Sequence, residues 1–405
     1  MKDYYKKELI KLGPITNQDD LEQQIKIKSA LITMGVVAQP KIIEEINKII
    51  YGSSNKEKRT GNIGIPANWG NDIQTMIPCE AMFESNNEKT FTQDSLIEVI
   101  EKQGGYHLVS EFEQFQFQLP IKIVPGPSWY PQQHKQHTFS EFVQYDFGNM
   151  IASIPTLKQK QFCDLQCKFC ELETKEKDFP PEILEEIIAL EINEKGQADI
   201  TLSGGSLESK DKGTMKFVKY LEKLKGKFGD KLWIELEFTP PKEAKYLDQL
   251  IDLGMNSALI NIETFNEKIA KEIMPKKAEI GIKHYLETIS YLSKKEVQIS
   301  SLVLLGLHPG ISQEQHKKEI IAGTKTLANI GASTIPQPYK PFLGTTLQKE
   351  KYFPCSPQLC YELTNDVVKI LKENELTSYN KGEHGCSGCG KCSLDTTIAK
   401  IGEEK

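Results

Sequence analysis

The sequence predicts an α/β protein built on a full or partial (β/α) TIM-like barrel of parallel strands. Three observations lead to this fold class. Strand-like and helix-like stretches alternate across residues 147–345, residues 1–146 lack that alternation, and residues 346–405 carry a cysteine-rich tail. We therefore expect an N-terminal extension, a barrel, and a C-terminal cap that holds cysteines.

The alternation comprises about six strand–helix steps of roughly 30–40 residues each, the length of βαβ units. Expected strands span residues 150–157, 198–203, 232–238, 257–263, 297–305 and 334–339, and expected helices begin at residue 180 or span 214–224, 241–253, 279–293 and 312–330. Such units pack as parallel strands joined by right-handed crossovers, with the active site at the carboxyl ends of the strands. An open doubly wound sheet is the structural alternative.

The N-terminal region has a different character. Residues 21–50 are expected to be helical, residues 63–69 and 119–124 extended, and Pro125-Gly126-Pro127 marks a bend or boundary. This region could cap the barrel, bind substrate or mediate assembly. After the barrel, residues 357–373 are expected to form a further helix.

Composition excludes two classes of protein. The chain has 50 Lys and Arg against 56 Asp and Glu, a formal charge of −6, so it lacks the basic face of a general nucleic-acid binder. Its apolar runs are far shorter than the ~20 residues of a membrane span. The charged first residues lack a secretory apolar core, so a reducing cytoplasmic setting is expected.

Cysteine grouping indicates metal chemistry. Eight of the nine cysteines fall into groups, and Cys79, which stands alone, is expected to be a small buried apolar residue. The groups are Cys163, Cys167 and Cys170; Cys355 and Cys360; and Cys386, Cys389 and Cys392. In a reducing compartment, clustered thiols are more often metal ligands than disulfides.

The loop after the first expected barrel strand has the spacing C-x-x-x-C-x-x-C. Three thiolates on one short loop can hold three irons of a [4Fe–4S] cluster and leave the fourth iron open to a small chelating ligand. A ferredoxin would close that position with a fourth cysteine, and structural zinc would want four ligands, usually in paired C-x-x-C elements.

With the aromatic Phe169 before its last cysteine, this loop resembles the radical S-adenosylmethionine (SAM) superfamily. The resemblance implies that Cys163, Cys167 and Cys170 hold a catalytic cluster whose open iron chelates SAM. It also implies that one electron from the cluster breaks a carbon–sulfur bond, giving a 5′-deoxyadenosyl radical that abstracts hydrogen from substrate. A structural metal loop is the alternative.

Two strand ends extend the resemblance to the SAM site. Ser203-Gly204-Gly205 resembles the glycine motif whose backbone meets the SAM amino group, although glycines also suit a plain strand-to-helix turn. Asn261 and Glu263 resemble the Asn-Leu-Asp-Thr segment of biotin synthases, which binds the SAM ribose, with Glu in place of Asp. Alternation puts both side chains on one strand face, and a helix cap near residue 264 is the alternative.

Two further segments fit the same family. Leu305, at the end of the fifth expected strand, resembles the segment that packs on adenine, although an apolar barrel strand would look the same. Residues 341–347 resemble the Pro-x-x-Gly-Thr-x-Leu stretch that closes many biotin-synthase-like barrels. Together the resemblances cover about residues 147–395 and favour the biotin-synthase-related branch.

Two carboxylates alternate with apolar residues on the third expected strand. Glu235 and Glu237 therefore share one face, expected to be the lumen, where they could bind the SAM ammonium, a cationic substrate or a buried lysine. Glu237 is the favoured cofactor-binding residue because it is nearer the carboxyl end of the strand. The alternative places one acid in the lumen and one at the solvated mouth.

The tail spacing C-x-x-C-x-x-C predicts an Fe–S cap. We expect an auxiliary Fe–S cluster on Cys386, Cys389 and Cys392. A [4Fe–4S] cluster is the preferred interpretation, and a two-iron cluster or zinc are the alternatives. Cys355 or Cys360 could supply the fourth ligand, and Ser393 or His384 would be less usual. His134-x-x-His137 is a weaker candidate metal pair in a segment expected to be solvated.

Biotin synthases proper build their auxiliary cluster from barrel cysteines that this chain lacks, so the tail better resembles archaeal-type lipoyl synthase relatives. This implies sulfur insertion at unactivated carbon, with the auxiliary cluster as sulfur source. The alternatives are radical oxidation, cleavage or rearrangement with the cluster as electron relay, or a non-enzymatic Fe–S or zinc protein. Expected partners are a small-molecule or protein-carried acyl or peptide substrate, a ferredoxin or flavodoxin donor, and a second radical SAM protein.

Overall fold

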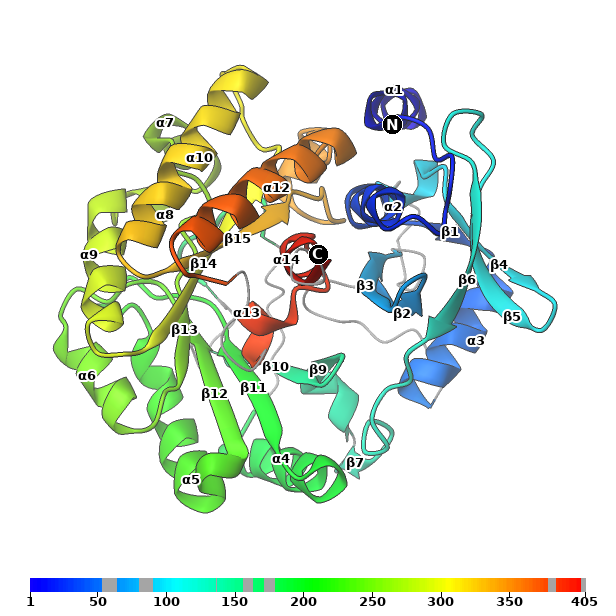
Figure 1. Ribbon diagram of the computed structural model, residues 1–405. Helices are drawn as coiled ribbons and strands as arrows, with labels where there is room; N and C mark the ends of the chain where they lie inside the picture. The colour runs from blue at the N-terminus through cyan, green and yellow to red at the C-terminus, as the bar shows by residue number, and fades with distance from the viewer. Residues whose placement is uncertain are drawn as a thin grey trace.

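The computed structural model describes residues 1–52, 64–79, 90–135, 137–155, 163–170, 179–377 and 384–401. Figure 1 shows a curved sheet wrapped by helices on one side, a second sheet with the N-terminal helices on the other, and the C-terminal helices between them. This arrangement puts the tail inside the molecule.

The larger sheet has seven strands in the order β15-β14-β13-β12-β11-β10-β9. Their bounds are β9 Val143–Asp146, β10 Asn149–Ser153, β11 Ala198–Ser203, β12 Leu232–Glu237, β13 Ser257–Leu259, β14 Gln298–Leu305 and β15 Ser333–Pro338. Strands β10 to β15 are parallel, and β9 pairs antiparallel to β10. Because β9 and β15 are the two edges, the sheet is a partial barrel, and the predicted fold class is confirmed.

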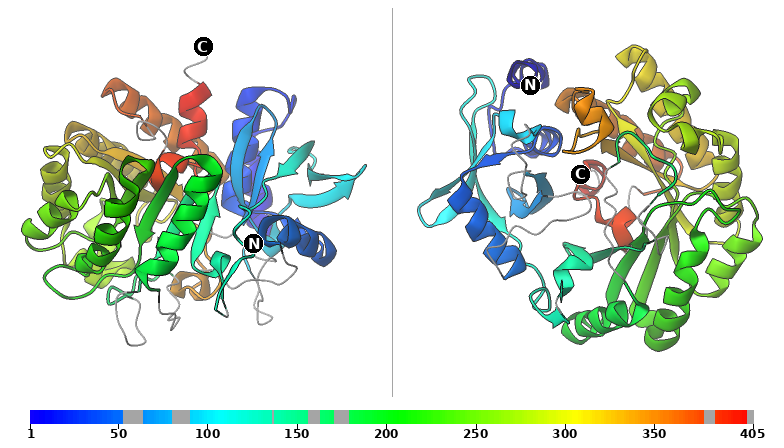
Figure 2. Two further views of the ribbon diagram at one scale, coloured as in Figure 1. Left: turned by 90° about the horizontal axis from the view of Figure 1, so that it is seen from below. Right: turned by 180° about the vertical axis from the view of Figure 1, so that it is seen from behind.

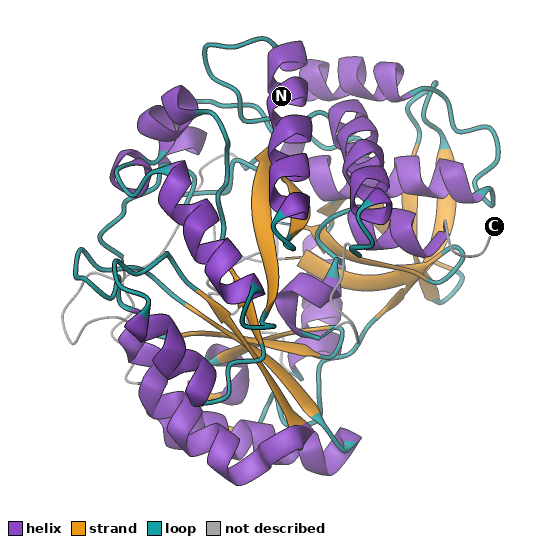
Figure 3. Cartoon of the chain, turned by 60° about the vertical axis from the view of Figure 1, so that its left-hand side comes forward, coloured by secondary structure: helices purple, strands orange, loops and turns teal. Residues whose placement is uncertain are grey.

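Helices cover the convex face of this sheet (Figure 3). They are α4 Pro181–Lys195, α5 Val218–Phe228, α6 Lys245–Asp252, α7 Glu267–Ile273, α8 Pro275–Ala278, α9 Ile282–Ser293 and α10 Gln313–Asn329. Local sequence sets their ends: the Ser312 hydroxyl accepts a hydrogen bond from Gln315 N at 3.1 Å to start α10, and left-handed Gly196 ends α4.

Two expected strands are shorter than predicted. The strand expected over 257–263 ends at Leu259. Glu263 takes a left-handed conformation (φ 67°) and forms an isolated bridge to Val303. The strand expected over 150–157 ends at Ser153, and residues 156 and 157 lie outside the described part of the chain.

The N-terminal part forms a six-stranded sheet in the order β1-β4-β5-β6-β2-β3. Its elements are α1 Lys2–Leu12, α2 Leu21–Met34, β1 Val37–Ala38, α3 Pro40–Tyr51, β2 Gly64–Trp69, β3 Ile73–Pro78, β4 Glu98–Lys102, β5 Gly105–Ser110 and β6 Phe117–Ile123. The single helix expected over 21–50 is wrong. Gly35 (φ 67°) breaks it, and a Cβ there would lie 2.5 Å from the Pro78 carbonyl oxygen.

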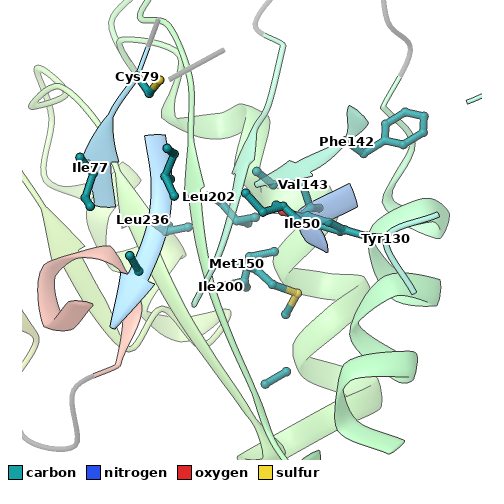
Figure 4. Close-up of a cluster of buried hydrophobic side chains, with 14 of the residues drawn as sticks. Ile50, Ile77, Cys79, Tyr130, Phe142, Val143, Met150, Ile200, Leu202 and Leu236 are labelled. Carbon is teal, nitrogen blue, oxygen red and sulfur yellow. The ribbon is translucent and has the colours of Figure 1, made fainter. Parts of the chain in front are cut away.

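One hydrophobic core runs through both parts. The same cluster of buried side chains includes Leu31 and Ile46 of the N-terminal helices and Ile200 and Leu236 of the barrel strands. Figure 4 shows part of it, where Ile50 meets Tyr130 and residues of β9–β11. Cys79 is completely buried in this core, as expected for a lone apolar thiol.

The tail consists of α11 Thr346–Lys349, α12 Pro357–Glu373, α13 Gly385–Cys389 and α14 Asp395–Ile401. Helix α13 packs on β10, β11 and β12, and α12 packs on α2, α10, α14 and β15. Both views in Figure 2 show the C-terminal helices between the barrel and the N-terminal module. Within the described residues, none of the helices combines the length and apolarity that a bilayer crossing would need.

Candidate functional site

The three-cysteine loop lies beyond the carboxyl end of β10 and is held by backbone contacts. The Cys163 Sγ accepts hydrogen bonds from Leu165 N at 3.4 Å and from Ser206 N at 3.3 Å. Asp164 N donates to Ser206 O at 2.8 Å, which ties the loop to the turn after β11. Backbone N–H groups directed at a sulfur atom are the environment that a metal-bound thiolate uses.

Two thiols of this loop have pKa values above that of a free cysteine. Burial raises the pKa of Cys167 to about 12, although the nearby Lys277 ammonium opposes the shift, and burial raises the pKa of Cys170 to about 12 as well. Among the residues with a described placement, no three acidic, thiol or imidazole side chains converge on a single metal ion. Cluster ligands need not converge, because each thiolate binds a separate iron, so the three thiols fit a [4Fe–4S] cluster.

A buried ion pair lies beside this loop. Lys277 Nζ is 2.9 Å from the Glu263 Oε1, and both side chains are nearly inaccessible to solvent. The carboxylate of Glu263, which the sequence assigns to the SAM ribose, is therefore already engaged by a lysine. Sequence reasoning missed Lys277 because it belongs to α8, with the whole of α7 between it and the expected strand end.

Asn261 faces the neighbouring strand. Its Nδ2 donates to Glu237 Oε1 at 2.7 Å, and its Oδ1 accepts from Leu302 N at 3.1 Å. The ribose role assigned to Asn261 and Glu263 stays a prediction.

The glycine segment after β11 is bound by a second lysine that the sequence analysis missed. Lys216 Nζ donates to the Gly205 carbonyl at 2.7 Å, and it lies against Gly204, where a Cβ would come within 2.9 Å of it. The ammonium also interacts electrostatically with Cys163 and Glu237, while burial lowers the pKa of Lys216 to about 7. Lys216 lies in the 3₁₀ helix Thr214–Phe217, and its distance along the sequence from the glycines matches no recognised motif.

The two β12 carboxylates point to the lumen, as the alternation predicts, but they have different partners. Glu235 is fully buried and accepts from Thr201 Oγ1 at 2.9 Å and from Cys386 N at 2.8 Å. Glu237 is half-buried and accepts from Ser203 Oγ at 2.5 Å and from Asn261. Burial raises the pKa of both carboxyls, and the hydroxyl donors oppose the shift.

The tail cysteines spread across the lumen. Cys386 lies against β11 and β12 through its N–H contacts to Thr201 and Glu235, and Cys389 Sγ lies 4.0 Å from the Asp146 carbonyl oxygen of β9. The Cys392 carbonyl accepts from Gln337 Nε2 of β15 at 3.4 Å. The tail therefore crosses the concave face from one side of the sheet to the other.

Two less usual candidate ligands are already engaged. His384 pairs with Asp199 at 2.9 Å and stacks on Trp233 at 4.5 Å between ring centroids, and the Ser393 hydroxyl donates to Asp395. His134 lies in the β7–β8 hairpin (Gln133–His134 and His137–Thr138), where it pairs with Glu186. His137 contacts Glu141, so each imidazole of the weaker metal pair has its own carboxylate.

Leu305 does not face the lumen. Strand register places Glu237, Leu259 and Ser300 on one face, and Leu302 and Leu304 continue it, so Leu305 points outward. Its side chain belongs to a core cluster with Cys355 and Cys360. Leu302 and Leu304 instead pack with Cys167 and Phe169, so they are the apolar β14 residues nearest the three-cysteine loop.

Comparison with known proteins identifies the central part of the chain. The family model of the Radical SAM superfamily matches residues 160–320, and a search of curated proteins finds no match. Methylornithine synthase is similar in structure (15% identity, 62% of this chain and 69% of that one, TM-score 0.44).

Two further structures are similar. One is coproporphyrinogen III oxidase from Escherichia coli (15% identity, 55% of this chain and 52% of that one, TM-score 0.38). The other is HydG, a maturase of the [FeFe]-hydrogenase (13% identity, 61% of this chain and 55% of that one, TM-score 0.41). The chain spans only about half the length of these two proteins. The part of the chain that is similar to the Radical SAM superfamily is therefore residues 160–320, which include the three-cysteine loop.

Proposed function

We propose that this protein is a radical SAM enzyme with two cysteine centres, and that its substrate binds in the lumen between them. The similarity of residues 160–320 to the superfamily implies an enzyme that uses a [4Fe–4S] cluster and SAM. In the proposal, Cys163, Cys167 and Cys170 hold that cluster. When bound, the cluster and SAM supply a 5′-deoxyadenosyl radical that takes hydrogen from substrate.

The observation that carries the proposal is the position of Glu237. Glu237 accepts from the hydroxyl of Ser203, three residues before the Ser206 N–H that binds Cys163 Sγ, and its strand neighbour Glu235 accepts from Cys386 N at 2.8 Å. Both cysteine groups therefore border one lumen. The loop cysteines lie at the carboxyl end of the strands, the tail cysteines lie further inside, and the β12 carboxylates lie between the two groups. A molecule bound beside Glu237 would have the loop centre on one side and the tail on the other.

Two charged groups near the loop are complementary to the methionyl end of SAM. The Lys216 ammonium at the Gly204-Gly205 turn suits a carboxylate. The half-buried Glu237 carboxylate, which accepts hydrogen bonds from the neutral side chains of Ser203 and Asn261, suits an ammonium. We assign Lys216 and Glu237 to these roles, together with the backbone of the glycine segment. Phe169, Leu302 and Leu304 then form the apolar wall of the site.

For the reaction itself we propose sulfur insertion at unactivated carbon, with an auxiliary Fe–S cluster on Cys386, Cys389 and Cys392 as the sulfur source. The support is that the tail enters the lumen, where such a cluster would face the substrate. The second candidate is an oxidative radical reaction in which the tail centre accepts an electron. It is favoured by the buried position of Cys389, which suits an electron relay.

The first experiment tests the enzyme class. Anaerobically reconstituted protein incubated with SAM and dithionite should release 5′-deoxyadenosine, and Cys163→Ala should abolish the release. Cys79→Ala is the matched control, because it removes a buried thiol far from both groups. Release that persists in Cys163→Ala would contradict the assignment.

The second experiment separates the two reactions. Protein reconstituted with ³⁴S-sulfide is turned over with an octanoyl-lysyl peptide, and the product is analysed by mass spectrometry. Sulfur insertion predicts labelled sulfur in the product and loss of iron from the tail. An oxidised, sulfur-free product with intact clusters would favour the relay.

A further inference from the structure

A second pair of thiols, Cys355 and Cys360, lies buried beside the tail cysteines. Cys355 precedes α12 and is 1% exposed, and Cys360 lies in its first turn and is 0% exposed. Both are free thiols, and they lie near enough for each to shift the pKa of the other. Thiols this deeply buried are out of reach of a protein partner, so an exchange or delivery role does not suit them.

The fold makes room for this pair at one glycine. Gly306, which follows β14, has φ 81°, and a Cβ there would lie 2.7–2.9 Å from the Cα, Cβ and Sγ of Cys355. The Gly306 N–H is held by His316 Nε2 at 3.2 Å. Only glycine permits both the left-handed turn and the close approach of the thiol.

A buried ammonium faces the same thiols. Lys340 is 5% exposed, and its interactions with negative groups are with the thiols of Cys392, Cys360 and Cys355. In the described ranges of the chain, Lys340 forms no ion pair with a carboxylate. Burial lowers the pKa of Lys340, and a negatively charged cluster on these sulfurs would oppose that shift and favour the charged ammonium.

The end of β15 brings the two thiol groups together. Gln337 donates to the carbonyl of Cys392, and the Tyr339 carbonyl accepts from Cys355 N at 2.8 Å. Gln337 and Tyr339 are two positions apart, which is about 6–7 Å along a strand. Lys340 follows directly, so its backbone lies at the strand end that contacts both Cys355 and Cys392.

We infer that Cys355 and Cys360 line one side of the tail centre, which we call its closing wall. The pair supplies the fourth sulfur ligand of the cluster, and Lys340 offsets the negative charge of the cluster. The inference rests on the proposed second centre and adds its ligand set and its counter-ion. It also implies that the centre is fully ligated by the protein at rest, so a sulfur atom leaves it only if one of these bonds breaks.

The test uses the full chain with Cys163, Cys167 and Cys170 changed to Ala, so that only the tail centre can take up iron. After anaerobic reconstitution, iron content and the electron paramagnetic resonance (EPR) spectrum of the reduced protein are measured. We expect a four-iron centre in this background, and a three-iron centre or loss of iron when Cys355→Ser and Cys360→Ser are added. The single substitutions identify the ligand, and Cys79→Ser, another buried thiol, should change nothing.

Two outcomes have different meanings. If the background protein binds no iron, the proposed second centre fails. If the background binds the cluster and the Cys355→Ser/Cys360→Ser variant has the same iron content and spectrum, the second centre stands and the closing wall is overturned.

The Lys340 part is tested by the reduction potential of the same centre. Lys340→Met removes a positive charge beside the cluster, so the midpoint potential should become more negative, whereas Lys340→Arg should stay close to the background. Circular dichroism checks that both variants fold. An unchanged potential in folded Lys340→Met would overturn the counter-ion role.

Discussion

Two carboxylates on one strand serve different parts of the lumen. Glu235 receives the N–H of Cys386 and a hydroxyl of Ser387 from the tail helix, whereas Glu237 receives only Ser203 and Asn261 from the strands beside it. The period of two in the strand puts both carboxylates on one face. Glu235 contacts the tail helix, whereas Glu237, two residues later, is half-buried and faces the proposed SAM site. Their substitutions should therefore have different effects.

Glu237→Gln should impair SAM cleavage. A hydrogen bond to a charged group contributes about 1.5–3 kcal/mol, so the loss of charge should lower the specificity constant for SAM roughly 10- to 150-fold. Steady-state release of 5′-deoxyadenosine measures the effect. Glu235→Gln is the matched control, and it should instead weaken iron retention by the tail. Equal SAM kinetics in both variants would exclude Glu237 from the cofactor site.

Lys277→Met should destabilise the fold. The substitution leaves the buried Glu263 carboxylate without its partner at 2.9 Å, which costs about 3–5 kcal/mol for a buried pair. The double variant Lys277→Met/Glu263→Gln removes both charges and should recover most of the loss. Urea unfolding followed by circular dichroism gives the comparison. Additive losses in the two single variants and the double variant would show that the pair contributes no coupling.

At the scale of elements, a buried histidine holds the connection between β14 and α10. The buried His316 of α10 accepts the Gly306 N–H at 3.2 Å and lies 5.2 Å, between ring centroids, from His308. Burial lowers the pKa of His316 to about 4, and the neighbouring His308 adds to the shift. A neutral imidazole is required, because a protonated one has no lone pair for the Gly306 N–H.

This element predicts acid sensitivity. Between the ordinary histidine pKa near 6.5 and the folded value of about 4, the unfolded chain binds the proton and the folded chain does not. Stability should therefore be complete above pH 6.5 and fall by about 3 kcal/mol as pH drops to 4.

His316→Gln, which keeps an acceptor for Gly306, should flatten that part of the pH dependence of urea unfolding. His134→Gln, in a half-exposed hairpin, should leave it unchanged. A pH profile that is the same in the wild type and His316→Gln would refute the assignment.

At the scale of the whole molecule, the N-terminal module holds the tail in the barrel. The completely buried Lys28 of α2 donates to Thr397 Oγ1 of α14 at 2.6 Å, and Met76 N of β3 donates to the Lys391 carbonyl at 3.0 Å. With the core continuous across both parts, the module is one wall of the chamber around the tail cysteines. It has this position whatever else it binds.

The shared core predicts cooperative unfolding. Calorimetry of the full chain should give one transition in which the van't Hoff and calorimetric enthalpies agree. Leu31→Ala, inside the common cluster, should cost about 2–5 kcal/mol and move the whole transition. An exposed-position control, Ile10→Ala, should have little effect. Two separated transitions would contradict a continuous core.

The sequence alone determined the class of fold and the grouping of the three loop thiols, because both depend on local patterns. Strand and helix periods fix the α/β alternation, and three thiols within eight residues can meet only as a group. The period of two also placed Glu235 and Glu237 on one face. Leu305 shows the limit of the method, since the choice between it and Leu304 depends on which face of β14 is the lumen.

The tertiary structure alone decided which distant residues share a site. Lys216, Lys277 and Lys340 reach their sulfur and carboxylate neighbours through turns and helices whose direction no local pattern encodes. Likewise, the path of the tail through the lumen depends on contacts between segments over 300 residues apart, such as Lys28 with Thr397. These long-range contacts form because distant segments bury their apolar surface together, whereas the motifs depend only on residues that are adjacent in the sequence.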